Sequence, residues 1–220
     1  REEKCEPELS EALAQFGDIF VNEAFGTNLL TLDFTTIMES IRAVYIDTSS
    51  YIDPTTKNNL DLVKWAQNAA SQHWGYVWGT YGEVFDQALY EYKLDQYPEE
   101  VGRYAAFIET NWLGGRTADC VGLIKGYGWL NPETQEIEYG TNGMADVGAD
   151  QMYENATEKG SIDSMPEIPG LAVWHTGHIG IYIGDGQFVH AANSRKGVIV
   201  SGLDEEWYAN RYLGAKRVID

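Results

Sequence analysis

Basic residues are scarce in this sequence. Lysine and arginine together number 15, against 34 aspartates and glutamates, so the formal net charge is -19 at pH 7. Long-range repulsion by this charge disfavours binding to nucleic acid and to anionic membrane surfaces. The composition therefore argues against a polyanion-binding module.

Long apolar runs, internal repeats and low-complexity tracts are also missing. No segment approaches the roughly 18 consecutive apolar residues that a transmembrane helix needs, so we expect no membrane span. The apolar content of 44% is typical of a stable globular protein, and 220 residues are enough to bury one substantial core. The chain begins at Arg1 and not at methionine, which suggests a shortened or a processed chain, and an export signal could have been removed.

Cysteine occurs only twice, as Cys5 and Cys120. Most lone cysteines in globular proteins are small buried hydrophobic residues. Cys120 differs in its setting, because it follows a glycine-rich loop and opens a predicted helix with Thr117 or Asp119 as its N-cap. Gly126 and Gly128 weaken that helix, which we expect to reach at most about three turns. Its predicted core-facing residues are Val121, Leu123, Ile124 and Tyr127.

The setting of Cys120 favours a reactive thiol. An ordinary thiol has a pKa of about 8.5, and a helix N-terminus and a nearby imidazole both favour the thiolate. We therefore predict that Cys120 is a nucleophile. A disulfide with Cys5 would consume it, so both cysteines are expected to be free thiols.

Three of the four histidines fall within one predicted β-hairpin. If residues 184–186 form a three-residue loop with Gly186 in the left-handed conformation, His190 lies opposite Gly180. His178 and His190 then share one face as diagonal neighbours, within reach of a ring-to-ring hydrogen bond. A two-residue Asp-Gly loop would move His190 to the other face. Ile179, Ile181, Ile183 and Val189 are predicted to form the core face.

These residues supply a nucleophile, a base and a group that orients the base, which together favour nucleophilic catalysis. Taken singly, His190 would be an interior histidine and His178 a residue at a strand end. An alternative interpretation of these residues is a zinc site made of Cys120, His175 and His178. We do not expect a metal there, since the histidines precede a strand and no second cysteine is nearby.

At these residues the chain resembles the NlpC family of bacterial cell-wall peptidases, which are papain-like cysteine enzymes. Three segments carry the resemblance: Asp-Cys-Val-Gly-Leu at 119–123, His-Ile-Gly-Ile-Tyr-Ile-Gly at 178–184 and Phe-Val-His-Ala at 188–191. A fourth is Tyr-Val-Trp-Gly at 76–79. The four segments occur in the family's order and the resemblance covers roughly residues 60–220.

The resemblance implies a papain-like α+β fold in which the nucleophile helix packs on a central antiparallel sheet. Cys120 would be the nucleophile, His178 the general base and His190 the third residue of the triad. Tyr76 and Trp78 would line the substrate site, and no cofactor would be needed. Asp119 resembles a carboxylate that holds the free amino group of the substrate in some members, and helix capping is an equal alternative.

The family resemblance also implies a substrate and a location. The substrate would be a peptidoglycan stem peptide, cut between D-glutamate and a diamino acid through a thioester, by a secreted or cell-wall-associated enzyme. Two alternatives are an amidase or acyl transferase with the same triad, and a catalytically decayed cell-wall binding module.

The chain departs from the family pattern in three places. Val121 replaces a serine that commonly follows the nucleophile. Residues 86–112 form an insertion, predicted as two helices with the second begun by Pro98, which could wall the substrate cleft. Residues 1–58 precede the peptidase domain predicted for 59–220, and their apolar periodicity predicts a helical subdomain. Of the C-terminal aromatics, Trp207, Tyr208 and Tyr212 are read as packing residues.

Overall fold

The computed structural model describes residues 57–131, 133–134 and 136–219. The helical subdomain predicted for residues 1–58 lies outside the described residues, apart from residues 57 and 58. Cys5 also lies outside them. No helix in the described ranges is long and apolar enough to cross a lipid bilayer.

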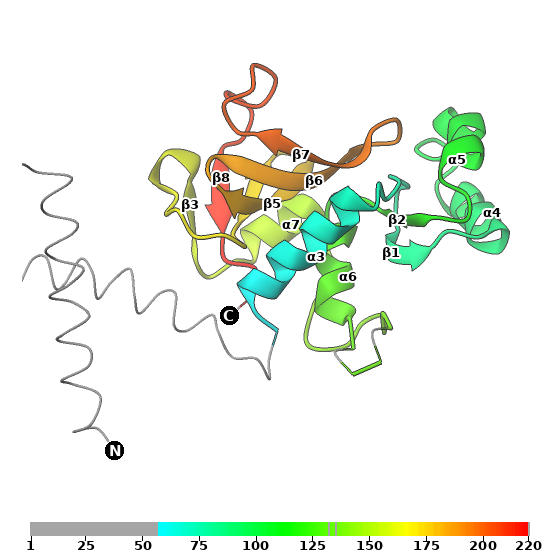
Figure 1. Cartoon of the computed structure of the whole chain (residues 1–220), viewed down its shortest axis with the longest axis horizontal. Coiled ribbons are helices and arrows are strands. Elements are labelled where there is room, and N and C mark those ends of the chain that lie inside the picture. Colours follow the sequence, from blue (N-terminus) through cyan, green and yellow to red (C-terminus); the bar gives the residue numbers. More distant parts are fainter. Residues whose placement is uncertain (1–56, 132, 135, 220) are drawn as a thin grey trace, which may run out of the picture. The chain divides into compact units, whose positions relative to one another are not determined.

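A six-stranded antiparallel sheet forms the centre of the described fold, with strand order β3-β8-β4-β5-β6-β7 (Figure 1). A separate two-stranded sheet pairs β1 with β2. The strands of the large sheet are β3 (Lys159–Ser161), β4 (Ala172–His175), β5 (His178–Gly184), β6 (Gln187–Asn193), β7 (Gly197–Gly202) and β8 (Gly214–Lys216). The small sheet contains β1 (Tyr81–Val84) and β2 (Arg116–Ala118).

Helices α3 (Asn59–Ser71) and α6 (Gly122–Trp129) contact each other, and α3 also packs on β5, β6 and β7. Asn58 caps α3 by accepting the Asp61 backbone N–H. Helix α7 (Ala149–Glu154) contacts β4 and β5. This mixture of helices and an antiparallel sheet confirms the predicted α+β class.

The sheet has a different apolar layer on each face. On the helix side, Ile179, Ile181 and Val189 join the large core that includes Leu62 and Leu123. The opposite layer contains aromatic residues of the sheet and of the C-terminal segment, which are Tyr182, Phe188, Tyr208 and Tyr212. The core face predicted for the hairpin is confirmed, with Ile183 partly buried against it.

The β5–β6 hairpin corrects the predicted loop but confirms the predicted register. Its turn is the two-residue Asp185-Gly186 pair, both with positive φ, and Gly184 pairs with Gln187. A bulge between Tyr182 and Gly184 absorbs one residue, so Ile181 still faces Val189 and Tyr182 still faces Phe188. The bulge therefore cancels the shift that a two-residue turn would otherwise cause.

Two helical glycines let α6 approach the small sheet. A Cβ on Gly122 would lie 1.9 Å from the Thr80 carbonyl oxygen, and one on Gly126 would lie 1.8 Å from that of Tyr81. Both contacts are with backbone atoms, which cannot move aside as a flexible side chain can. Glycine, a poor helix former, is therefore required at these two positions because the helix passes directly over the Thr80 and Tyr81 backbone.

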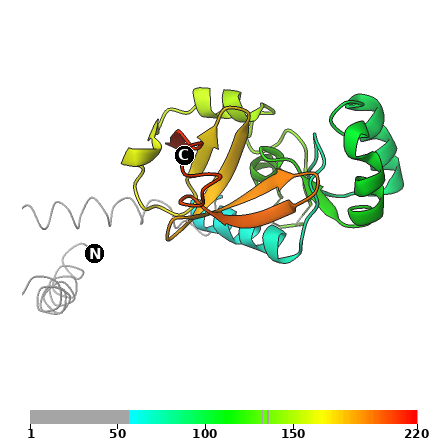
Figure 2. The same ribbon diagram turned by 90° about the horizontal axis from the view of Figure 1, so that it is seen from above.

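The insertion at residues 86–112 contains α4 (Gln87–Gln96), the 3-10 helix η3 (Gly102–Tyr104) and α5 (Ala105–Asn111), beside the sheet in Figure 2. The prediction that Pro98 begins the second helix was wrong. Residues 98–101 form a turn, and α5 starts only at Ala105. The insertion shares a small core with the main fold through Val77, Phe85, Tyr90, Val101 and Ile108.

Trp112 joins the end of the insertion to the β6–β7 turn. Its indole N–H donates a 2.8 Å hydrogen bond to the Ser194 carbonyl. The ring fills the space beside two glycines, because a Cβ on Gly75 or Gly197 would lie 2.5 Å or 3.2 Å from it. The insertion is thereby attached to the sheet at its C-terminal end.

Candidate active site

Cys120 lies in a turn between β2 and α6. The helix starts at Gly122, two residues later than predicted. Asp119 is the residue that caps this turn: its Oδ1 accepts the Gly122 N–H at 2.6 Å and its Oδ2 accepts the Gly79 N–H at 2.8 Å. Thr117, the other predicted cap, lies in β2 with its hydroxyl buried and without a hydrogen-bond partner among the described residues.

The Asp119 carboxylate is buried, with 7% of the residue exposed. Burial raises its pKa, whereas the hydrogen bonds from the Gly122 and Gly79 amides lower it. Both oxygens thus already have backbone partners. The structure shows the capping contacts, and the predicted contact with a substrate amine stays a prediction.

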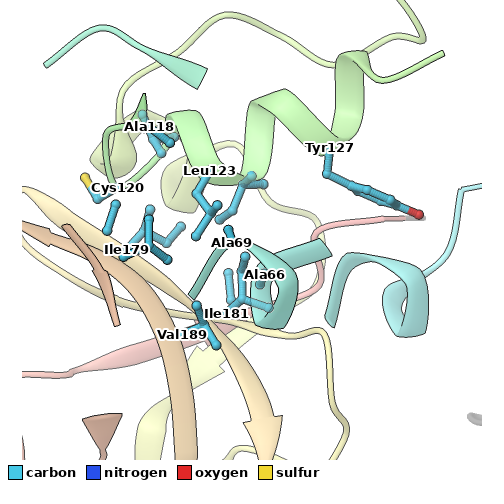
Figure 3. Close-up of a cluster of buried hydrophobic side chains, with 14 of the residues drawn as sticks. Ala66, Ala69, Ala118, Cys120, Leu123, Tyr127, Ile179, Ile181 and Val189 are labelled. Carbon is cyan, nitrogen blue, oxygen red and sulfur yellow. The ribbon is translucent and has the colours of Figure 1, made fainter. Parts of the chain in front are cut away.

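The Cys120 side chain lies beside Ile179 at the start of α6 (Figure 3). Only 5% of the residue is exposed. Burial, with a smaller contribution from the Asp119 charge, raises the pKa of the thiol to about 12. Hydrogen bonding with the backbone of Ile179, Val121 and Cys120 itself lowers the pKa but does not compensate. Desolvation therefore outweighs the local features that favour a thiolate, and the resting thiol is protonated.

The two predicted histidines are in direct contact. Nε2 of His178 and Nδ1 of His190 form a 2.8 Å hydrogen bond across the β5–β6 hairpin. His190 is 1% exposed, and its Nε2 lies 3.3 Å from the Ser201 hydroxyl and 3.4 Å from the Tyr208 hydroxyl. Gly180 leaves room for this pair, because a Cβ there would lie 3.1 Å from that of His190. The predicted juxtaposition is confirmed.

Both rings of this pair are neutral at pH 7. Burial, with a contribution from the neighbouring His175, lowers the pKa of His178 to about 4. Burial also lowers the pKa of His190 to about 2, with a contribution from His178. A neutral imidazole can accept a proton, so His178 is in the form that a general base requires.

His175 extends the histidine cluster. It pairs with His178 across β4 and β5, and the two rings stack with centroids 5.3 Å apart. In the part of the chain that the structure describes, no group of three or more histidine, cysteine or acidic residues is arranged to hold a metal ion.

Tyr76 and Trp78 line a cavity of about 300 Å³ beside the insertion. Tyr76 is buried, and after desolvation the charges of Cys120 and Asp119 are what raise its pKa, which indicates that it lies near both. Trp78 is 41% exposed. The remaining lining residues come from the insertion and the end of β6: Glu99, Glu100, Arg103, Tyr104, Ala192, Asn193 and Ser194. The insertion therefore forms a wall of this cavity.

Sequence reasoning missed two residues of the site. Tyr208 contacts His190, and the Tyr212 ring lies edge-on to the His175 ring at 5.0 Å. Both were read only as packing residues. The sequence indicates their positions only weakly, because two tyrosines four residues apart do not show which strand they pack against.

The model of the NlpC/P60 family matches residues 109–217. This match contains the Cys120 turn, the β5–β6 hairpin and the residues Tyr208 and Tyr212. Residues 109–217 of this chain belong to the NlpC/P60 family. The predicted papain-like arrangement, with the Cys120 turn and α6 packed against an antiparallel sheet, is the fold of this NlpC/P60 domain.

Two curated relatives are similar to parts of this chain. The murein DD-endopeptidase MepS/murein LD-carboxypeptidase of Escherichia coli K12 is 52% identical over 42 residues, which are 19% of this chain and 22% of the relative. The probable peptidoglycan endopeptidase LytE of Bacillus subtilis is 32% identical over 112 residues, 48% of this chain and 29% of the relative. The chain thus spans less than a third of the length of either relative.

Two solved structures resemble the fold at low identity. The NlpC/p60 domain of the peptidoglycan hydrolase SagA is 20% identical with a TM-score of 0.40, covering 73% of this chain and 98% of that domain. The peptidoglycan hydrolase RipB of Mycobacterium tuberculosis is 18% identical with a TM-score of 0.41, covering 99% of this chain and 86% of that one.

We expect His178 to titrate far below the ordinary histidine pKa of about 6.5, with a midpoint of about 4 in the folded protein. NMR titration of the imidazole protons measures this directly. The unfolded chain takes up the proton first as the pH falls, so the free energy of unfolding should decrease between about pH 6.5 and about pH 4. The slope is up to about 1.4 kcal/mol per pH unit for each such histidine. A folded-state midpoint near 6.5 would contradict the buried site.

Proposed function

We propose that this chain is a cysteine peptidase that hydrolyses an amide bond in peptidoglycan stem peptides. The observation that carries the proposal is the 2.8 Å His178–His190 hydrogen bond, in a domain whose Cys120 opens the neighbouring helix turn. The named relatives that share this domain are murein or peptidoglycan endopeptidases, which supports the substrate class. The bond between D-glutamate and a diamino acid follows from the resemblance to the NlpC family.

The histidine pair sets the tautomer of the base in this proposal. Each neutral ring carries one N–H. If His190 donates from Nε2 to the Ser201 hydroxyl, its Nδ1 is free to accept from Nε2 of His178. His178 then keeps the lone pair of its Nδ1 for the thiol proton. His190 therefore orients the base and does not itself attack.

The protonated resting thiol makes proton transfer part of the attack. Cys120 loses its proton to His178 as its sulfur bonds to the substrate carbonyl carbon, and the imidazolium returns the proton to the leaving amine. The backbone of Cys120 and Val121, directly before α6, already hydrogen-bonds with the thiol, and its amides are the proposed donors to the oxyanion. Water then hydrolyses the thioester.

The cavity beside the insertion is the proposed substrate-binding site. Tyr76 connects it to the nucleophile, and Trp78 offers an exposed aromatic face. The insertion adds two carboxylates and one guanidinium to its lining, from Glu99, Glu100 and Arg103. A stem peptide carries free amino and carboxylate groups that these charges would bind. Secretion or attachment to the cell wall, where such substrates occur, is part of this proposal.

The decisive experiment is the digestion of defined muropeptides by the wild type and by Cys120→Ala. We expect the wild type to release fragments that begin with the diamino acid, identified by mass, and the variant to release none, because no other group can form the thioester. Added amine acceptors test for a transferase, which would yield amide products in place of acids. Binding without turnover by the wild type would indicate a decayed binding module.

His190 variants test the orienting role. Replacing His190 by glutamine or asparagine keeps a hydrogen-bonding group for the His178 ring, so we expect a modest loss of kcat. Alanine frees the ring to adopt other tautomers and rotamers, and should reduce kcat by roughly a hundredfold or more. The unfolding midpoint of each variant controls for loss of structure. Full activity of a folded His190→Ala protein would exclude the triad.

Charge variants of the insertion test the cavity. Because removing the whole insertion would expose Phe85 and Val77, single substitutions are preferable to trimming residues 86–112. Glu99→Gln or Glu100→Gln should raise KM for amine-bearing muropeptides about two- to fivefold, as expected for a partly solvated charge pair. Glu91→Gln, on the exposed face of α4, is the matched control and should leave KM unchanged. Equal KM values for all these variants would make the insertion purely structural.

A further inference from the structure

The hydroxyl group of Tyr212 is buried and has no hydrogen-bond partner within the described residues. Only 3% of the residue is exposed. Three other buried tyrosine hydroxyls have partners: that of Tyr127 bonds to the Asn58 backbone, that of Tyr182 to Glu167 and that of Tyr208 to His190. A buried hydroxyl that makes no hydrogen bond destabilises the folded state, so its retention calls for an explanation.

Tyr212 lies at the proposed catalytic site. Its ring is edge-on to His175 at 5.0 Å and to His178 at 6.5 Å between ring centroids. The charge of Cys120 is among the influences that raise its pKa, which places it near the nucleophile as well. The next residue, Leu213, donates its backbone N–H to the Trp174 carbonyl at 2.9 Å, which fixes this segment against β4.

The hydroxyl is available only as a neutral donor. Burial raises the pKa of Tyr212 well above the ordinary tyrosine value, so the group remains protonated wherever the fold is stable. A fixed neutral donor that has already lost its hydration needs no reorganisation when charge develops beside it. This is the property that makes hydrogen-bond donors effective in oxyanion holes.

We propose that Tyr212 is a catalytic residue whose hydroxyl donates a hydrogen bond to the carbonyl oxygen of the substrate during attack by Cys120. This inference rests on the proposed function for the identity of the nucleophile. The sulfur–carbon bond forms as the carbonyl π electrons move to oxygen, and His178 holds the thiol proton. The Tyr212 proton stays on its own oxygen. The carbonyl re-forms when the carbon–nitrogen bond breaks and the amine takes the proton from His178.

The test compares acylation with alkylation in Tyr212→Phe. Acylation of Cys120 by an activated ester such as p-nitrophenyl acetate passes through an oxyanion, whereas alkylation by iodoacetamide does not. We expect acylation to slow by about 10- to 100-fold, somewhat less than for loss of a principal oxyanion-hole donor. Alkylation should be unchanged. With muropeptides, kcat should fall by a similar factor while KM changes little.

The stability of the variant provides a second readout. Phenylalanine keeps the ring and removes a buried hydroxyl without a partner, so the urea midpoint of Tyr212→Phe should rise or stay the same. Tyr127→Phe is the matched control, at the opposite end of α6 from Cys120 (Figure 3). It loses hydrogen bonds to the Asn58 backbone N–H and carbonyl, so its midpoint should fall while acylation stays at the wild-type rate.

Three results would overturn the role of Tyr212. They are unchanged acylation, an equal loss of acylation and alkylation, and failure of Tyr212→Phe to fold. Failure of the proposed function looks different. If wild type and Cys120→Ala react equally with the ester, the nucleophile is wrong. If the ester acylates Cys120 but no muropeptide is cleaved, the substrate is wrong and the assignment of Tyr212 is unaffected.

Discussion

The site depends on the pairing register between β5 and β6. Side chains alternate along a strand, so a shift of one residue would place His190 in the helix-side core and remove it from His178. The two-residue turn at Asp185-Gly186 would cause that shift alone, and the bulge before Gly184 reverses it. The hydrogen bond between the histidines, the space beside Gly180 and the contact with Tyr208 all follow from this one compensation.

Burial determines the resting chemistry of the site. Desolvation by burial lowers the pKa values of both histidine rings and raises that of the Cys120 thiol, which lies in the helix-side core. An ion pair between thiolate and imidazolium would have to exist in surroundings that disfavour both charges. Cys120 and the two histidines are therefore uncharged at neutral pH.

Local patterns predicted much of this arrangement. Alternation along the hairpin placed His178 and His190 together, and helical spacing correctly buried Leu123 and Ile124. What failed depends on contacts between distant segments. The pKa of Cys120 depends on burial by elements that no local motif reveals, and the start of α6 at Gly122 depends on the Asp119 cap and on β1. The places of Tyr208 and Tyr212 depend on how the C-terminal segment returns to β4, which their sequence spacing does not indicate.

The hydrogen bond from the Trp112 indole to the Ser194 carbonyl links two segments that lie far apart in the sequence. Ser194 directly follows β6, the strand that carries His190, and Trp112 directly follows α5. The insertion and the strand that carries His190 are thus attached to each other at one point. A change in insertion length that displaced Trp112 would also disturb the end of β6, so the shape of the cavity and the position of His190 are mechanically coupled.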